Sequence, residues 1–121
     1  MDETRFGLPI ATWTAAKDEA TAILQEIARQ KKLITYSDLA REISSAHFER
    51  HDFRLFGLIG DISEEENALG RGMLSALVVT QDERKPGLGF FELAKKLGFK
   101  PRNHLAFWSK EVERVYAAWD I

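Results

Sequence analysis

The chain contains no cysteine among its 121 residues. Without a thiol it can form no disulfide, offer no thiolate to a metal ion and supply no cysteine nucleophile. It also lacks any apolar run close to the roughly 20 residues of a membrane-spanning helix. Its acidic first residues lack the apolar core of a signal peptide. We therefore expect a cytoplasmic protein with no membrane among its partners.

An excess of positive charge is also missing. Lysine and arginine number 17 against 19 aspartate and glutamate residues, which gives a net charge of -2. A protein that binds nucleic acid mainly by charge is usually basic, although a local basic face can coexist with an acidic back. The rest of the composition is ordinary for a globular protein. The length predicts one domain, residues 1–121, that buries about two-thirds of the surface of its unfolded chain.

Hydrophobic periodicity predicts a largely helical chain. Thr35 and Asp52 are suitable caps for two helices, and Gly98 is a suitable stop for another. We expect an irregular arm at residues 1–11, helices near residues 14–31, 36–43, 53–67, 90–97 and 104–119, and a turn at residues 81–89. The apolar run Met73–Val79 is β-branched at its end and alternates too little for a one-sided strand, so it predicts a strand buried on both faces.

Four short motifs follow one another in the chain: Tyr36-x-x-Leu39-Ala40, Arg54-x-x-Gly57, the run Met73–Val79 and Gly87-Leu88-Gly89-Phe90. Their order resembles the C-terminal DNA-binding domain of the alkylguanine–DNA alkyltransferases and of their catalytically inactive relatives, the alkyltransferase-like proteins. The resemblance covers about half of the chain. It implies an α+β, mainly helical, winged-helix-like single domain with a small sheet and, in this chain, a C-terminal aromatic helix.

The resemblance also implies roles for individual residues. In that family the tyrosine corresponding to Tyr36 presses on a phosphate, and the arginine corresponding to Arg54 enters the duplex where a nucleotide is flipped out. Each has an ordinary alternative: Tyr36 can be a half-buried packing residue, and Arg54 a salt-bridged arginine on a helix surface. The remaining candidate contacts to the DNA backbone are Lys31, Arg71, Arg84 and Lys85.

The chain departs from the family at the reactive position. Ser75 lies where the alkyl-accepting cysteine would fall, with Ala76 and Leu77 in place of the family's histidine and arginine. Ser75 is then a hydrogen-bonded core serine rather than a nucleophile, since no His–Asp relay accompanies it. His47 and His51 could share a helix face, but two ligands make no metal site. We therefore expect neither an enzyme nor a cofactor or metal.

A second function stays open. The three carboxylates Glu64, Glu65 and Glu66 would repel phosphate, and as an interface they would suit a basic protein partner. The aromatic stripe of the last helix is either core or, if exposed, an anchor for such a partner. The chain is therefore predicted to bind nucleic acid, with distorted or alkylated DNA as the suggested ligand. The alternative is a small protein-binding module, such as an immunity protein, an antitoxin or an adaptor.

Overall fold

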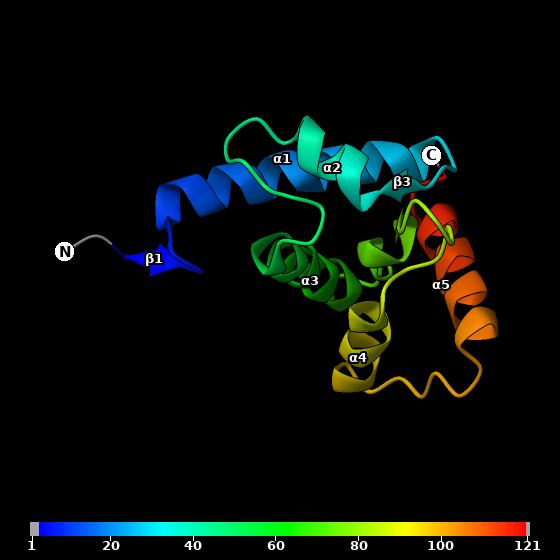
Figure 1. The fold of residues 1–121 in the computed structure, drawn as a ribbon. Helices are drawn as coiled ribbons and strands as arrows, with labels where there is room; N and C mark the ends of the chain where they lie inside the picture. The colour runs from blue at the N-terminus through cyan, green and yellow to red at the C-terminus, as the bar shows by residue number, and fades with distance from the viewer. Residues whose placement is uncertain (1–2, 121) are drawn as a thin grey trace.

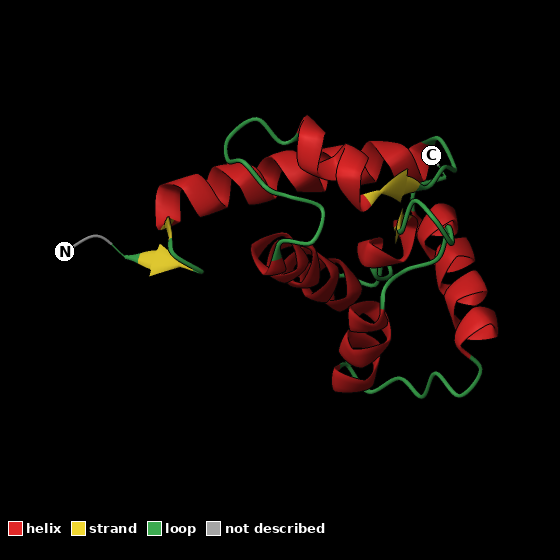
Figure 2. Cartoon of the chain, in the orientation of Figure 1, coloured by secondary structure: helices red, strands yellow, loops and turns green. Residues whose placement is uncertain are grey.

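The computed structural model describes residues 3–120 and has the mainly helical α+β fold that the sequence predicts (Figures 1 and 2). The elements in chain order are β1 (Thr4–Arg5), β2 (Leu8–Pro9), α1 (Ile10–Arg29), β3 (Ile34–Thr35), α2 (Tyr36–Glu42), α3 (Phe53–Ala68), the 3-10 helix η1 (Leu74–Leu77), β4 (Val78–Val79), α4 (Leu88–Lys96) and α5 (His104–Ala118). The strands form two small sheets, β1 antiparallel to β2 and β3 parallel to β4.

Helix α1 runs along one side of the molecule, and the end of α5 returns to its C-terminal end (Figure 1). Its buried stripe consists of small and aliphatic residues four apart, with Ala16, Ala20, Leu24 and Ala28 each fully buried. The tyrosine hydroxyl of Tyr116 on α5 donates a 2.7 Å hydrogen bond to the carbonyl of Lys32 just beyond α1. This hydrogen bond joins the last helix to the segment that follows the first helix.

Residues 3–11 have more regular structure than expected, and the first two residues of the predicted arm lie outside the described residues. Residues 4–9 form a hairpin, and α1 begins at Ile10 rather than near residue 14. Phe6 and Gly7 have positive φ angles and make the turn. The ring of Phe6 lies 5.3 Å from that of Trp13, between centroids, and so ties the hairpin to α1. The irregular arm predicted for this segment is therefore wrong for residues 4–9, which form a hairpin that an aromatic contact holds against α1.

The predicted starts of α2 and α3 are confirmed. The hydroxyl of Thr35 accepts a 3.1 Å hydrogen bond from the backbone N–H of Asp38. The carboxylate of Asp52 accepts a 2.9 Å hydrogen bond from the backbone N–H of Arg54. Both caps satisfy N–H groups that have no partner within the helix.

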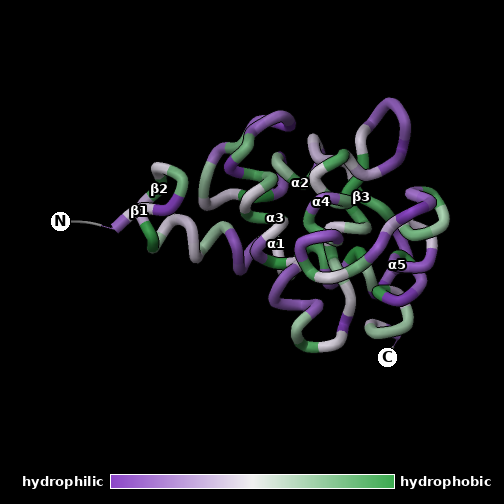
Figure 3. The backbone as a smooth tube through the Cα atoms, turned by 90° about the horizontal axis from the view of Figure 1, so that it is seen from below, coloured by the Kyte–Doolittle hydropathy of each residue, from purple (hydrophilic) through white to green (hydrophobic). Residues whose placement is uncertain are grey.

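The strand predicted over Met73–Val79 is mostly wrong. Within this run the strand is limited to Val78–Val79, which pairs with Ile34–Thr35, while Leu74–Leu77 forms the 3-10 helix η1. The prediction of burial on all sides is correct, since Leu74, Leu77 and the two valines are fully buried. A continuous apolar run shows burial but does not distinguish a strand from a buried helical turn. Hydrophobic stretches accordingly gather inside the molecule, and hydrophilic loops lie outside (Figure 3).

The turn predicted at residues 81–89 is confirmed over residues 81–87, whereas Leu88 and Gly89 already belong to α4, which begins before the expected residue 90. The turn is closed by a 2.8 Å hydrogen bond from the backbone N–H of Thr80 to the carbonyl of Lys85. Helix α4 ends before Gly98, whose φ of 97° suits the position after a helix. The indole N–H of Trp108 on α5 donates a 2.7 Å hydrogen bond to the carbonyl of Ala76, which fixes α5 against η1.

Candidate functional site

A pocket of about 470 Å³ lies between α2, α3, η1 and the turn that precedes α4. Tyr36 and Phe56 form one wall, and Ser75 of η1 contributes to the same lining. The residues Gly87–Phe90 complete it from the side of α4. Three of the four motifs that carry the family resemblance thus contribute to one cavity, although they are far apart in the chain.

Ser75 is the unusual group in this pocket. The residue is 5% exposed, as expected for a core serine, but the expected hydrogen bond is missing, because its hydroxyl has no partner among the described residues. The backbone N–H of Ser75 is satisfied separately, by a 2.7 Å hydrogen bond to the hydroxyl of Ser63 on α3. A buried hydroxyl without a partner costs about 1–3 kcal/mol. The hydroxyl itself is buried, so a ligand atom would supply the missing hydrogen bond once the side chain of Ser75 turns towards the pocket that this residue lines.

Tyr36 is half-buried and has its hydroxyl at the other side of the pocket. That hydroxyl accepts a 3.2 Å hydrogen bond from the backbone N–H of Gly87, which joins α2 to the turn before α4. Burial raises the pKa of Tyr36 above its usual value of 10. The phenol therefore keeps its proton at neutral pH, and this proton can be donated to a ligand.

The mouth of the pocket is apolar and open. The ring of Phe56 packs edge to face on Tyr36, with 5.5 Å between centroids and 83° between planes. Phe56 is 47% exposed and Leu88 is 72% exposed. Gly60 and Gly89 line the pocket with no side chain, and a Cβ atom at either would meet no atom within 4 Å. The cavity can therefore admit a flat group past an aromatic rim.

Arg54 does not line this pocket, and its guanidinium is bound by other residues of the chain. Its guanidinium makes a 2.6 Å ion pair with Asp52 and donates a 3.3 Å hydrogen bond to the carbonyl of His47. It also lies 5.5 Å from the centroid of Phe48. The ion pair lowers the pKa of Asp52 to about 2 and raises that of Arg54. Of the two roles considered for Arg54, insertion into a duplex and a salt bridge on a helix surface, its placement corresponds to the salt bridge.

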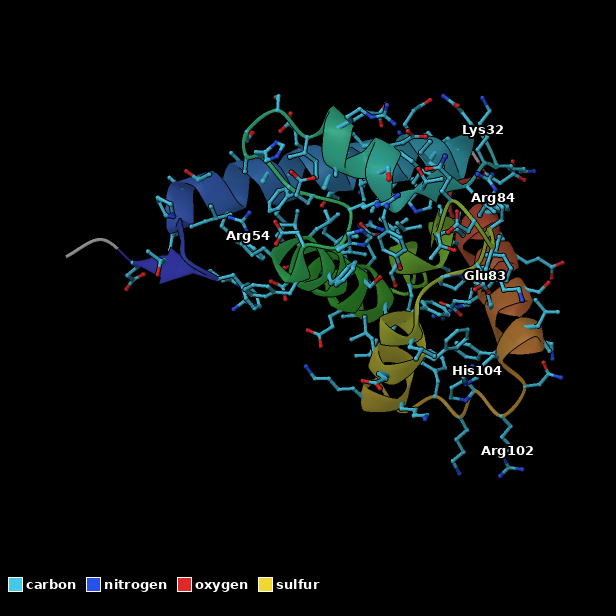
Figure 4. The ribbon with its side chains drawn as sticks, in the orientation of Figure 1. Lys32, Arg54, Glu83, Arg84, Arg102 and His104 are labelled. Atoms are coloured by element: carbon cyan, nitrogen blue, oxygen red, sulfur yellow. The ribbon has the colours of Figure 1, made fainter. Side chains whose placement is uncertain are left out.

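The other predicted cations are not gathered around the pocket. Arg71 pairs with the buried Glu66 at 2.5 Å, and Lys31 lies 3.8 Å from Asp120. Arg84 and Lys85 lie on the exposed turn after β4. Figure 4 shows Arg84 on the side of the molecule away from Arg54. None of these four cations lines the pocket, and Arg71 and Lys31 instead lie near the end of α5, where they contact Trp119 and Asp120.

The carboxylates proposed for a protein interface are each paired within the chain. Glu64 makes a 3.0 Å ion pair with Lys96, and Glu65 pairs with Lys17. Glu66 is buried and holds Arg71. The three carboxylates therefore present less free negative charge than their spacing in the sequence suggests.

The aromatic stripe of α5 is mainly core. Trp119 is 8% exposed and is bordered by the guanidinium groups of Arg29 and Arg71, at 4.9 and 5.1 Å from its ring. Trp108 is half-buried and holds Ala76. The aromatic residues of the stripe are thus buried or half-buried, while Leu105 at its start is 59% exposed.

Two groups near the pocket were not among the predicted site residues. Arg50 and His51 line it, and the Nε–H of Arg50 donates a 2.9 Å hydrogen bond to Nε2 of His51. Phe53 and Phe56 are exposed beside it. The sequence does hold a signal for the phenylalanines, because both flank the apolar stripe of α3 instead of belonging to it. It holds none for the loop residues, whose position depends on how residues 43–52 fold back.

Within residues 3–120, no group of three or more histidine, aspartate and glutamate side chains is placed to hold a metal ion. No helix of this range has both the length and the apolar character required to cross a membrane. None of the protein-family models, curated proteins or solved structures with which the chain was compared matches it.

Proposed function

We propose that the chain is a non-enzymatic nucleic-acid-binding domain that takes one flipped-out base into the pocket beside Tyr36 and Ser75. The observation that carries this proposal is the buried hydroxyl of Ser75, which has no partner among the described residues, in a mostly apolar pocket whose lining also includes Tyr36, Arg50 and His51. Small-molecule sites have this character, with mostly apolar walls and a few polar atoms that fix orientation. The family resemblance adds to it, because Ser75 occupies the position of the alkyl-accepting cysteine.

A nucleobase fits the chemistry of the lining. Its flat faces can pack against aromatic rings such as those of Tyr36 and Phe56, and its edge carries donors and acceptors that the hydroxyls of Tyr36 and Ser75 can pair with. A purely aliphatic ligand would leave the Ser75 hydroxyl without a partner. A base that is distorted or alkylated is easier to extrude than a well-paired one, because less pairing and stacking is lost.

The proposal includes no reaction. Activation of a serine hydroxyl requires a neighbouring base that can remove its proton. Here Nε2 of His51 already accepts a hydrogen bond from Arg50, and Ser63 accepts from the backbone N–H of Ser75. Among the described residues no base is hydrogen-bonded to the hydroxyl of Ser75, which favours a serine that recognises a ligand over one that attacks it.

A protein-binding module remains the second candidate, and one observation favours it. Phe53 is 65% exposed and Phe56 is 47% exposed, side by side on α3. Exposed aromatic residues in a cluster are typical anchors of protein interfaces. The paired carboxylates make Glu64–Glu66 a weaker choice for this role than the phenylalanines.

Filling the pocket tests the proposal. The probes are fluorescently labelled duplexes, one plain and one carrying an alkylated guanine, and anisotropy reports binding. Gly60→Leu places a side chain in the open part of the pocket, whereas Ala68→Leu adds the same side chain to an exposed position of the same helix. We expect the wild type and Ala68→Leu to prefer the modified duplex and Gly60→Leu to lose at least about tenfold in affinity. Equal binding by both variants, or no binding by the wild type, would contradict the proposal.

A further inference from the structure

Three exposed phenylalanines continue the aromatic wall of the pocket over the surface. Phe6, Phe53 and Phe56 are 41%, 65% and 47% exposed. The rings of Phe6 and Phe53 lie 5.8 Å apart at 70°, and Phe53 and Phe56 share a face of α3 because they are three residues apart. Phe56 contacts Tyr36 inside the pocket. We call Tyr36, Phe56, Phe53 and Phe6 the aromatic track.

The track is built into the fold. Gly57 lies under the ring of Phe6, where a Cβ atom would come within 2.8 Å of that ring. Phe6 is further held by Trp13 and by the guanidinium of Arg5, which lies 5.1 Å from its ring. The hairpin thus places Phe6 against α3. The row of rings therefore extends beyond the two phenylalanines that α3 itself supplies. Exposed apolar surface of this extent generally marks a contact site.

The cations beside the track are mostly occupied. Arg5 pairs with Asp61 at 2.9 Å, and Arg54 pairs with Asp52 at 2.6 Å. Arg50, at the mouth of the pocket, donates to His51. Few positive charges are therefore free to hold phosphates, and affinity for nucleic acid would have to come from contact between rings and bases. In a duplex the faces of the bases are already covered by their neighbours, whereas unpaired bases expose them.

We infer that the aromatic track is a stacking surface for unpaired bases next to the one held in the pocket. The ligand is then single-stranded or locally unpaired nucleic acid and not intact duplex. This inference rests on the proposed function, since it extends the same site. Arg54 has no part in it, and the residue that reaches furthest towards solvent is Phe53.

The test compares a labelled single strand of about 12 nucleotides with its blunt duplex, by fluorescence anisotropy. The variants are Phe53→Ala, Phe53→Trp and the control Leu69→Ala, which removes an equally exposed apolar side chain, 64% exposed, beyond the other end of α3. We expect single strand to bind more tightly than duplex. Phe53→Ala should lose roughly 5- to 100-fold, because stacking contributes about 1–3 kcal/mol per base, while Phe53→Trp keeps the affinity and Leu69→Ala changes nothing.

Salt provides a second readout. With few phosphate contacts, the logarithm of the binding constant should fall with the logarithm of salt concentration by a slope of only about −1 to −2. Equal affinity for single strand and duplex, or no effect of Phe53→Ala on affinity, overturns the inference about the aromatic track. The pocket is still tested separately by Gly60→Leu. Failure of the wild type to bind any oligonucleotide overturns both. Self-association that Phe53→Ala abolishes, without a change in oligonucleotide affinity, would assign the surface to a second copy of the chain and overturn the inference.

Discussion

The hydroxyl of Ser63 accepts a 2.7 Å hydrogen bond from the backbone N–H of Ser75, while the buried hydroxyl of Ser75 has no partner among the described residues. The two serines therefore have different roles. Because residues 74–77 form a 3-10 helix and not a strand, the backbone N–H of Ser75 bonds to Ser63 instead of to a neighbouring strand, and this bond stabilises η1. Ser75 lines the pocket, and its hydroxyl contributes no hydrogen bond to the fold of residues 3–120.

Alanine at each serine should separate these roles. Ser63→Ala leaves the backbone N–H of Ser75 without an acceptor in a fully buried place, so we expect the free energy of unfolding to fall by about 1–3 kcal/mol. Ser75→Ala removes a hydroxyl that bonds to nothing and should change stability by less than about 0.5 kcal/mol or raise it. Urea unfolding measures both. A large loss in Ser75→Ala would mean that its hydroxyl has a partner and would remove the main support for a ligand site.

The glycines of α3 provide a matched pair. Gly57 contacts the ring of Phe6, whereas a Cβ atom at Gly60 would meet nothing within 4 Å. Gly60→Ala should therefore stabilise the helix by about 0.5–1 kcal/mol, as expected for glycine in a helix interior. Gly57→Ala should gain less, since it must displace Phe6 from α3.

Two measurements check this pair. Thermal unfolding should show a higher Tm for Gly60→Ala than for Gly57→Ala. The fluorescence of Trp13, whose ring lies 5.3 Å from that of Phe6, should change in Gly57→Ala alone. The same tryptophan signal in both variants would show that the hairpin does not depend on Gly57.

Buried Glu111 predicts a further loss of stability. Its carboxylate accepts a 2.8 Å hydrogen bond from the backbone N–H of Met73 and pairs with Arg114 at 3.0 Å. Glu111→Ala leaves that N–H buried and unpaired, so we expect a loss of about 2–3 kcal/mol by urea unfolding. The exposed Glu113 on the same helix is the control, and Glu113→Ala should stay within about 0.5 kcal/mol. Similar effects of the two substitutions would argue against this anchor.

The helices could be predicted from the sequence because their signals are local. Thr35, Asp52 and Asn103 accept hydrogen bonds from their own first turns, and Gly98 has the φ angle that its position after α4 requires. Caps and stops act within a few residues, so their effect can be deduced without the fold. The η1 segment could not be deduced in this way. Its conformation depends on Ser63 and on the helices around it, which lie far away in the sequence.

Of the residues predicted to bind nucleic acid, Tyr36 lines the pocket. Ser75, which the sequence indicates only as a core serine, and the motif residues Gly87–Phe90 line it as well. The role considered for Arg54 depended on a free guanidinium. Asp52, two residues earlier, both caps α3 and binds that guanidinium, and the sequence alone shows only the first of these. The motifs therefore indicate which residues lie close together in the fold. They do not show which acidic partner each cation binds, because this depends on all the side chains that the folded chain brings near it.

Asp52 gives a prediction for pH. Its pKa of about 2 in the folded chain, against the usual 3.8, means that folding favours the ionised carboxylate. The resulting stabilisation is complete above about pH 5 and is lost as the pH falls through 3.8 towards 2. Asp52→Asn keeps a capping side chain but cannot ionise, so it should be less stable than wild type at pH 7, by about 1 kcal/mol. Urea unfolding at several pH values should show this difference vanishing near pH 2, and a constant difference would contradict it.

Asp52→Asn also tests which residue contacts nucleic acid. Without the carboxylate, the guanidinium of Arg54 loses its ion pair and keeps only the hydrogen bond to the carbonyl of His47 and the contact with Phe48. If Arg54 enters the base stack, as the family resemblance implies, its release should raise affinity for duplex about three- to tenfold, and Arg54→Ala should abolish binding. If the aromatic track carries recognition, Arg54→Ala should leave the affinity for single strand within about twofold. Asp52→Asn should then change the slope of the logarithm of the binding constant against the logarithm of salt concentration by less than about 1, the change that one added phosphate contact would cause. We expect the second pattern, because the ring of Phe53 is exposed while the guanidinium of Arg54 is bound.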